Sequence, residues 1–260
     1  MLNALTTLRL IKPAFLFVLN FKRLLYLMAV PSAAAFFTLL AESFYPLFSL
    51  AETAEIKLVV NFYMLGFLAV ILLFLALSLM KHVQQIVFFG ESVEKRRFFV
   101  PFPDKSFWIY FSDVFYIFIN ALFFAAVSGY LLLAVLTYFL PLPEKANLYM
   151  LLGAAVFLPY FMIRFSLVLP ASVAGKKLRF WDSWKMTRRI SPMIALTLAL
   201  FLLLPLGAAV GLYTLVQNTV DNTAVVYFVT NFCALLSLLF SSVLFAAYSA
   251  YLYSAAAEQG

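Results

Sequence analysis

Long apolar blocks dominate the chain and are separated by short polar or basic segments. A helix that spans a membrane needs about 20 mostly apolar residues. Six segments meet this requirement: 24–41, 57–80, 107–140, 147–170, 192–217 and 223–254. The blocks are continuous, whereas the strands of outer-membrane barrels alternate apolar and polar residues. The pattern therefore predicts an all-α fold, a polytopic membrane bundle of six transmembrane helices.

The composition supports this class. Hydrophobic residues make up 66% of the 260 residues and charged residues only 11%, whereas about a quarter of an average soluble domain is charged. This excludes an ordinary soluble globule and a disordered chain.

The basic residues lie on one side of the predicted bundle. Fifteen of the 18 Lys and Arg residues precede the first span or lie in the links between spans two and three and between spans four and five. The opposite links carry only Lys57 and Lys145. Because positive charge stays in the cytoplasm, we expect both termini to be cytoplasmic. The net charge of +7 then reflects topology, and no nucleic-acid partner is expected.

Rare residues exclude several kinds of site. Cys233 is the only cysteine and His82 the only histidine, so an intrachain disulfide and a clustered zinc or iron–sulfur site are excluded. We expect Cys233 to pack within a helix and His82 to lie at a solvated helix end. No nucleophile elbow, phosphate loop or dinucleotide motif occurs. We therefore expect no catalytic residue, no metal, no cofactor and no enzymatic activity.

A basic segment with aromatic residues precedes each pair of spans. We expect a single transmembrane domain over 1–260, built from three units of interfacial segment plus helical hairpin at 1–80, 81–170 and 171–260. The alternative is that membrane topology alone places a basic link at every second connection.

The third basic segment, FWDSWKMTRRI, has two faces. On a helical wheel, Phe180, Trp184, Thr187 and Ile190 share one arc, and charged residues take the other. Such a helix lies in the membrane plane with its charges toward the headgroups, and indole rings favour that interface. The alternative is a helix that only packs across the cytoplasmic end of the bundle. The residues expected to contact anionic headgroups are Lys176, Lys177, Arg179, Lys185, Arg188, Arg189, Trp181 and Trp184.

The same region resembles a known family. An apolar run ends at Pro170, the turn AGKKL follows, and then comes an aromatic-led amphipathic helix, FWDSWKMTRR, before the next span. This order resembles the YciC-like proteins and the membrane domain attached to some glycerophosphoryl diester phosphodiesterases, a group of bacterial multi-pass membrane proteins. The resemblance covers about forty residues and departs from the family at 189–192. It implies a helical protein of the bacterial inner membrane with interfacial helices, and no enzymatic activity is carried over.

Two ionisable residues lie within predicted spans, where charges are costly and point to function. Asp113 is about six residues into the third span, and Arg164 is about six residues before the end of the fourth at Pro170. These spans form one antiparallel hairpin, so we expect Asp113 and Arg164 to form an intramembrane ion pair. The pair is either a structural clasp or part of a polar cavity with Asn61 and Asn120.

Small residues four apart mark helix faces that allow close packing. We expect such packing at Gly207 and Gly211 in the fifth span and at Ala246 and Ala250 in the sixth. The partner is either a neighbouring helix of the same chain or a second copy in a homo-oligomer.

These features favour a non-enzymatic bacterial inner-membrane protein that acts through lipid or membrane-protein contacts at its cytoplasmic face. Its expected partners are membrane lipids, and in addition another membrane protein or a second copy. The alternative is a transporter or channel for a lipid-like or small anionic solute. Polar residues in the spans are few, so an apolar lipid-facing groove is easier to build than an aqueous pore. A bundle without any cavity would defeat this alternative.

Overall fold

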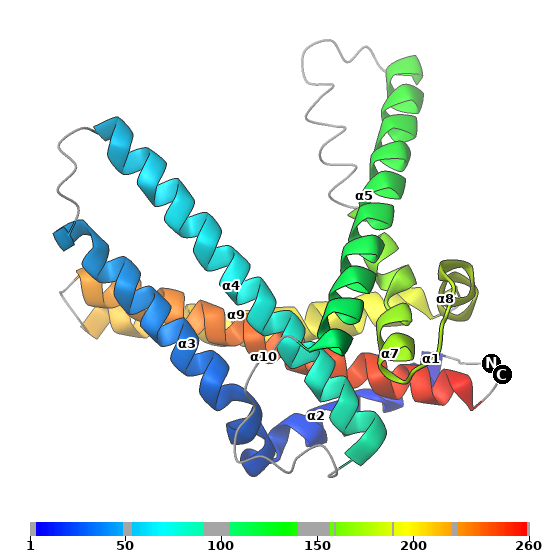
Figure 1. The fold of residues 1–260 in the computed structure, drawn as a ribbon. Helices are drawn as coiled ribbons and strands as arrows, with labels where there is room; N and C mark the ends of the chain where they lie inside the picture. Colours follow the sequence, from blue (N-terminus) through cyan, green and yellow to red (C-terminus); the bar gives the residue numbers. More distant parts are fainter. Residues whose placement is uncertain are drawn as a thin grey trace. The chain divides into compact units, whose positions relative to one another are not determined.

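The computed structural model describes residues 4–48, 54–90, 104–139, 157–158, 160–188, 190–219 and 223–258 (Figure 1), and most of these are helical, with no strand among them. The all-α class is confirmed. The helices are α1 (Ala4–Arg9), α2 (Ile11–Leu19), α3 (Phe21–Phe48), α4 (Ala54–Phe89), α5 (Lys105–Phe139), α7 (Val168–Val173), α8 (Phe180–Thr187), α9 (Ser191–Thr219) and α10 (Thr223–Ala257).

Long apolar helices occupy five of the six predicted segments, namely α3, α4, α5, α9 and α10. In the fourth segment, 147–170, residues 147–156 and 159 lie outside the described residues, and Tyr160–Val173 is a shorter apolar helix. Within the described ranges, Val70–Phe89, Lys105–Val135 and Phe228–Ala257 are long and apolar enough to cross a membrane. A fourth candidate is the pair Thr7–Leu19 and Lys22–Phe37, bent by 71°. The described structure thus has three or four candidate spans.

The chain forms two compact units, each made of discontinuous segments. Unit 1 comprises Met1–Lys12, Pro103–Thr197 and Ser249–Gly260, and unit 2 comprises Pro13–Phe102 and Leu198–Tyr248. The organisation into three hairpins stays a prediction.

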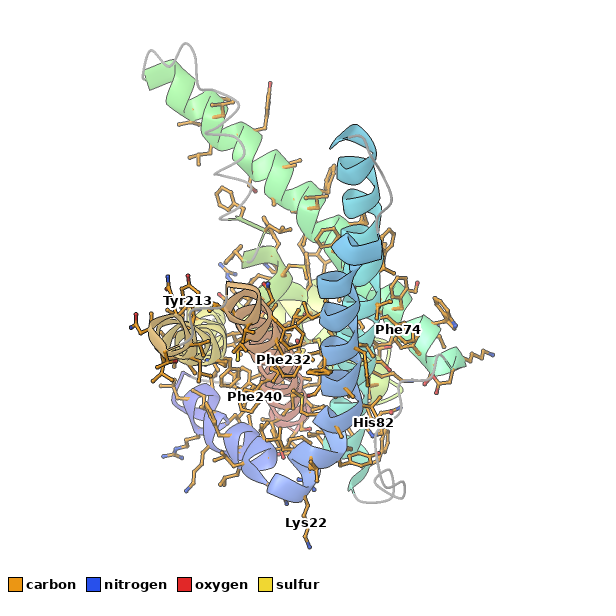
Figure 2. The ribbon with its side chains drawn as sticks, turned by 90° about the vertical axis from the view of Figure 1, so that its left-hand side faces the viewer. Lys22, Phe74, His82, Tyr213, Phe232 and Phe240 are labelled. Carbon is orange, nitrogen blue, oxygen red and sulfur yellow. The ribbon has the colours of Figure 1, made fainter. Side chains whose placement is uncertain are left out.

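Aromatic contacts join the helices of unit 2. The Phe36 ring of α3 lies edge-on to Phe228 and Phe232 of α10, with centroid distances of 5.4 and 5.7 Å. Tyr26 Oη lies 3.0 Å from His82 Nε2 and joins α3 to α4, and His82 is labelled in Figure 2. The expectation of a solvated helix end at His82 is wrong, because α4 continues to Phe89 and the imidazole is half-buried.

Proline 205 lies inside α9, where its missing N–H frees the carbonyl four residues earlier. That carbonyl belongs to Phe201 and accepts a hydrogen bond from Ser241 Oγ of α10 at 2.7 Å. Ser237 Oγ lies 3.0 Å from the carbonyl of Pro205 itself. Serine side chains of the neighbouring helix therefore satisfy the interrupted backbone, so that α9 continues past the proline.

The small-residue positions divide into two kinds. Ala246 and Ala250 are fully buried, as expected for close packing. Gly207 and Gly211 are exposed, and a Cβ at either position would meet no heavy atom within 4 Å among the described residues. No described residue therefore packs against these two glycines, and their packing against a second copy stays a prediction.

Candidate functional site: an aromatic and basic groove in unit 1

One face of α5 forms the first wall of the site. Asp104 caps this helix, because its carboxylate accepts a hydrogen bond from the backbone N–H of Phe107 at 2.6 Å. From this start, a period of 3.6 residues brings one set of side chains onto a single face. That set is Ile109, Asp113, Tyr116, Asn120 and Phe124, and all five line the cavity described below.

A break in the opposite segment, Tyr160–Val173, shapes the second wall. The helix turns at 166–167 and resumes as α7, because Pro170 has no N–H for the carbonyl four residues earlier. The sequence placed the end of this apolar segment at Pro170, whereas in the structure α7 continues to Val173. Ser183 Oγ of α8 donates to the carbonyl of Arg164 at 2.8 Å. Thr187 Oγ1 lies 2.8 Å from the carbonyl of Ser183 in its own helix and 3.2 Å from that of Arg164. Packing against the break holds α8 in place.

The turn between α7 and α8 carries the lysines. Gly175 has a φ of +74°, a conformation that other residues rarely adopt. The N–H of Lys176 donates to the carbonyl of Ala171 at 2.9 Å, and the N–H of Gly175 donates to that of Ser172 at 3.0 Å. This is a Schellman motif, which ends α7 sharply. It leaves Lys176 and Lys177 exposed before the chain enters α8.

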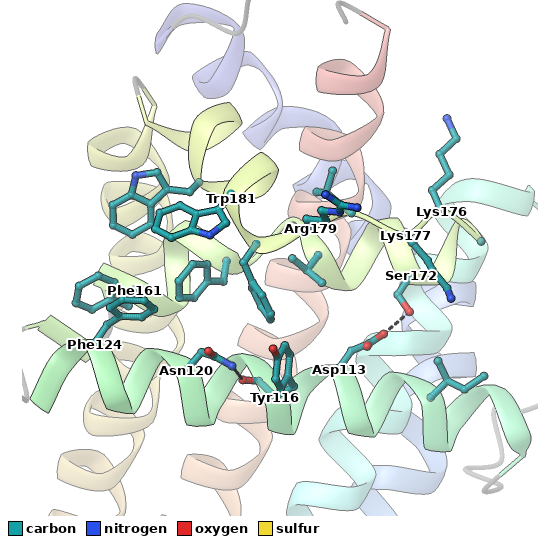
Figure 3. A pocket seen from close by; sticks show the side chains of 17 residues that line it. Asp113, Tyr116, Asn120, Phe124, Phe161, Ser172, Lys176, Lys177, Arg179 and Trp181 are labelled. Atoms are coloured by element: carbon teal, nitrogen blue, oxygen red, sulfur yellow. Dashed lines mark hydrogen bonds between the residues drawn. The ribbon is translucent and has the colours of Figure 1, made fainter. Parts of the chain in front are cut away.

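These elements enclose a cavity of about 850 Å³ that we call the groove. Besides the five residues of α5, the cavity is lined by residues of the segment Tyr160–Val173, of the turn that follows α7 and of α8: Phe161, Phe165, Val168, Ser172, Gly175, Lys176, Lys177, Leu178, Arg179, Phe180, Trp181 and Trp184. Figure 3 shows Phe124 and Trp181 toward one end and Asp113 with Lys177 toward the other. Along α5, Phe124 and Asp113 are eleven residues apart, about 16 Å at 1.5 Å per residue. The groove therefore has an aromatic end and a charged end.

Stacked rings build the aromatic end. Phe161 stacks on Phe124 at 5.5 Å and on Trp184 at 5.7 Å between centroids. Phe180 lies 5.1 Å from Phe165 in an edge-on arrangement and 4.8 Å from Tyr116. Ring contacts of this kind stabilise a rigid apolar surface.

Asp113 is held at the charged end by Ser172, whose hydroxyl donates to Oδ2 at 2.5 Å. The predicted ion pair with Arg164 is not formed in the structure. The helices pair in a different register, because Asp113 faces Ser172, eight residues or about 12 Å beyond Arg164. Asn120 also lines the groove, but its amide donates to the carbonyl of Tyr116 in its own helix. The side chain of Asn61 lies outside the described residues.

Arg164 is buried beside the aromatic end, with 1% of its surface exposed. Its Cζ lies 4.1 Å from the centroid of the Trp184 ring and 5.9 Å from that of Tyr160. Neither Nε nor Nη1 has a hydrogen-bond partner in the described part of the chain. Among the described residues, the printed contacts of this buried cation are thus with the aromatic rings of Trp184 and Tyr160.

The structure brings together five of the eight residues predicted to contact headgroups. Lys176, Lys177, Arg179, Trp181 and Trp184 all line the groove. Lys185 and Arg188 are exposed outside it. Arg189 lies outside the described residues.

The predicted arcs of the α8 segment are visible in its burial. Asp182 and Lys185 are exposed, whereas Thr187 is buried and Trp184 half-buried. Ile190, predicted to share the apolar arc, lies beyond the helix, which ends at Thr187.

The phenylalanine and tyrosine rings of the aromatic end, and Ser172, were not identified from the sequence. Tyr116 and Phe124 follow Asp113 at spacings that repeat the face of one helix, and this pattern was the available signal. Phe161 and Phe165 are four residues apart, a spacing that also places two side chains on one face of a helix. Across the described ranges, no three His, Cys, Asp or Glu side chains gather as a metal site would require.

Comparison with known proteins identifies no relative. No family model, no curated protein and no solved structure matches this chain significantly.

Proposed function

We propose that this chain is a non-enzymatic membrane protein that binds an anionic lipid in the groove of unit 1. The observation that carries the proposal is the combination of an aromatic end and a charged end, the latter with Lys176 and Lys177, within one cavity of about 850 Å³. A phospholipid has the same two parts, an apolar chain and a phosphate.

The size and lining of the groove support this ligand class. Sites for small molecules commonly measure about 300–1,000 Å³ and are mostly apolar, with a few polar groups that fix orientation. Lys176 and Lys177 are exposed at the charged end, where their ammonium groups can contact a phosphate. The cation of Arg164, behind the ring of Trp184, adds to the positive potential.

We also propose that the protein crosses the bacterial inner membrane six times with both termini in the cytoplasm. The asymmetry of Lys and Arg supports this topology, and the charged outer face of α8 supports an interfacial position for that helix. The groove would then open at the cytoplasmic leaflet, whose anionic lipids attract basic segments.

Native mass spectrometry of the purified, delipidated protein in a neutral detergent tests the proposal. We expect phosphatidylglycerol to bind more tightly than phosphatidylcholine with the same acyl chains. Each lysine near an anionic surface contributes about 1 kcal/mol, so the double variant Lys176→Gln/Lys177→Gln should weaken binding by about 2 kcal/mol, roughly 30-fold.

The matched control is Lys22→Gln/Lys105→Gln, which removes two charges from exposed lysines outside the groove. This control should retain nearly all of the binding. Equal affinity for the neutral and the anionic lipid, or equal losses in both double variants, would contradict the proposal.

A transporter for a lipid-like or small anionic solute is the second candidate, and the buried cation of Arg164 favours it. Transport requires flux, so fluorescent phosphatidylglycerol should move between the leaflets of proteoliposomes faster than in protein-free liposomes. Binding without flux would leave the first proposal standing and exclude the second.

A further inference from the structure

We propose that Asp113 makes the groove selective for phospholipids whose phosphate carries a hydroxyl-bearing headgroup, with phosphatidylglycerol as the simplest case. The same residue would select against a bare phosphate monoester such as phosphatidic acid. This inference rests on the proposed function, because it concerns the headgroup of the lipid in the same groove.

Among the described residues, the charged end of the groove contains one carboxylate, Asp113, together with several cations. Asp113 lines the cavity together with Lys176, Lys177 and Arg179. Its Oδ2 accepts the hydroxyl of Ser172 at 2.5 Å (Figure 3), and no described Lys or Arg forms an ion pair with it. Oδ1 therefore retains its capacity to accept hydrogen bonds from a ligand.

A carboxylate at this place changes which anions fit. A phosphate beside the lysines is repelled by Asp113, and the repulsion grows with the charge of the phosphate. A phosphodiester carries one negative charge, whereas a phosphate monoester carries between one and two at neutral pH. A site built for a phosphate alone would gain affinity by lacking this carboxylate.

Hydroxyl groups beyond the phosphate turn the same carboxylate into a favourable contact. They can donate to Oδ1, and hydrogen bonds to an ionised acceptor are stronger than neutral ones. An ammonium group would also pair with Asp113, but Lys176, Lys177 and Arg179 would repel it. The net positive lining thus favours a headgroup that is anionic overall and carries neutral donors.

Asp113 also links α5 to α7 through Ser172, so a structural role has to be separated from selection. Asp113→Asn keeps an oxygen that can accept the Ser172 hydroxyl and removes the charge. Ser172→Ala removes the hydroxyl and keeps the charge. A purely structural link would respond to the loss of the hydroxyl, whereas headgroup selection would respond to the loss of the charge.

The experiment measures lipid binding to the full chain by native mass spectrometry in a neutral detergent. The probes are phosphatidylglycerol, phosphatidic acid and phosphatidylethanolamine with identical acyl chains. We expect the wild type to prefer phosphatidylglycerol over phosphatidic acid about tenfold, because the glycerol hydroxyls donate to the ionised Asp113. Asp113→Asn should bind phosphatidic acid about tenfold more tightly, which removes the preference, and Ser172→Ala should keep the wild-type order.

Several results would overturn the inference. Equal binding of phosphatidylglycerol and phosphatidic acid by the wild type would do so without any variant. So would an unchanged preference in Asp113→Asn, or binding of phosphatidylethanolamine as tight as that of phosphatidylglycerol. If the wild type bound none of these lipids, the proposed function would fail as well, whereas binding without selectivity would refute the selection by Asp113 alone.

Discussion

Replacing Arg164 with methionine should stabilise the lipid-free protein, although it removes a buried interaction. Arg164 is 1% exposed, and its Cζ lies 4.1 Å from the Trp184 ring centroid. A desolvated cation–π contact of this kind contributes about 2 kcal/mol. Methionine has a similar length and retains a contact with the ring worth about 0.3–1.5 kcal/mol.

The opposing cost of the arginine is larger. Nε and Nη1 have no hydrogen-bond partner among the described residues, and each buried unsatisfied donor costs about 1–3 kcal/mol. No described carboxylate forms an ion pair with the guanidinium. Because replacing a buried charge with an apolar side chain of similar volume often stabilises a protein by about 1–4 kcal/mol, we expect Arg164→Met to gain stability within that range.

Thermal unfolding in a neutral detergent, followed by tryptophan fluorescence, measures the effect. A neutral detergent is needed because an anionic one could pair with the guanidinium. At about 2–4 °C per kcal/mol for a chain of this size, Tm should rise by about 2–16 °C. Arg164→Lys should show no such rise, because the buried charge remains.

Thr187→Val is the control at the same corner of unit 1. It removes the hydroxyl that lies 2.8 Å from the carbonyl of Ser183 and 3.2 Å from that of Arg164 and should lower stability by about 1 kcal/mol. If Arg164→Met instead lowered Tm as Thr187→Val does, while Arg164→Lys left it unchanged, the charge would be paired and the reasoning would be wrong.

Two further predictions concern surfaces. Gly207→Ala should stabilise α9 by about 0.5–1 kcal/mol, because alanine favours the helix and its Cβ would meet no described atom within 4 Å. A lower Tm together with loss of a dimer in size-exclusion chromatography would instead show that a second copy packs there. The variant Arg188→Cys, made at an exposed residue in a Cys233→Ser background, should react with a membrane-impermeant maleimide only after the cells are opened. Labelling of intact cells would contradict the proposed topology.

The helices could be predicted from the sequence because their cause is local. Apolar blocks of about 20 residues form helices wherever backbone groups must satisfy one another, and five of the predicted segments are long helices in the structure. Local rules also account for the turn at Gly175 and for the exposed face of α8. The residues from Lys176 to Trp184 could be identified as a candidate site for the same reason, since basic and aromatic residues mark an interface by their type alone.

Only the tertiary structure decided which residues meet. The sequence placed Asp113 and Arg164 at equal depth, but the register between α5 and the segment Tyr160–Val173 depends on how the two helices pack, and no local pattern fixes that packing. In that register, Asp113 accepts a hydrogen bond from Ser172 and Arg164 lies against the Trp184 ring. The groove lies between α5 and the segments that carry Ser172 and Trp184. Packing also decided that Ser241 satisfies the carbonyl freed by Pro205. Such contacts join residues far apart in the chain, and their energies depend on partners that the sequence does not place side by side.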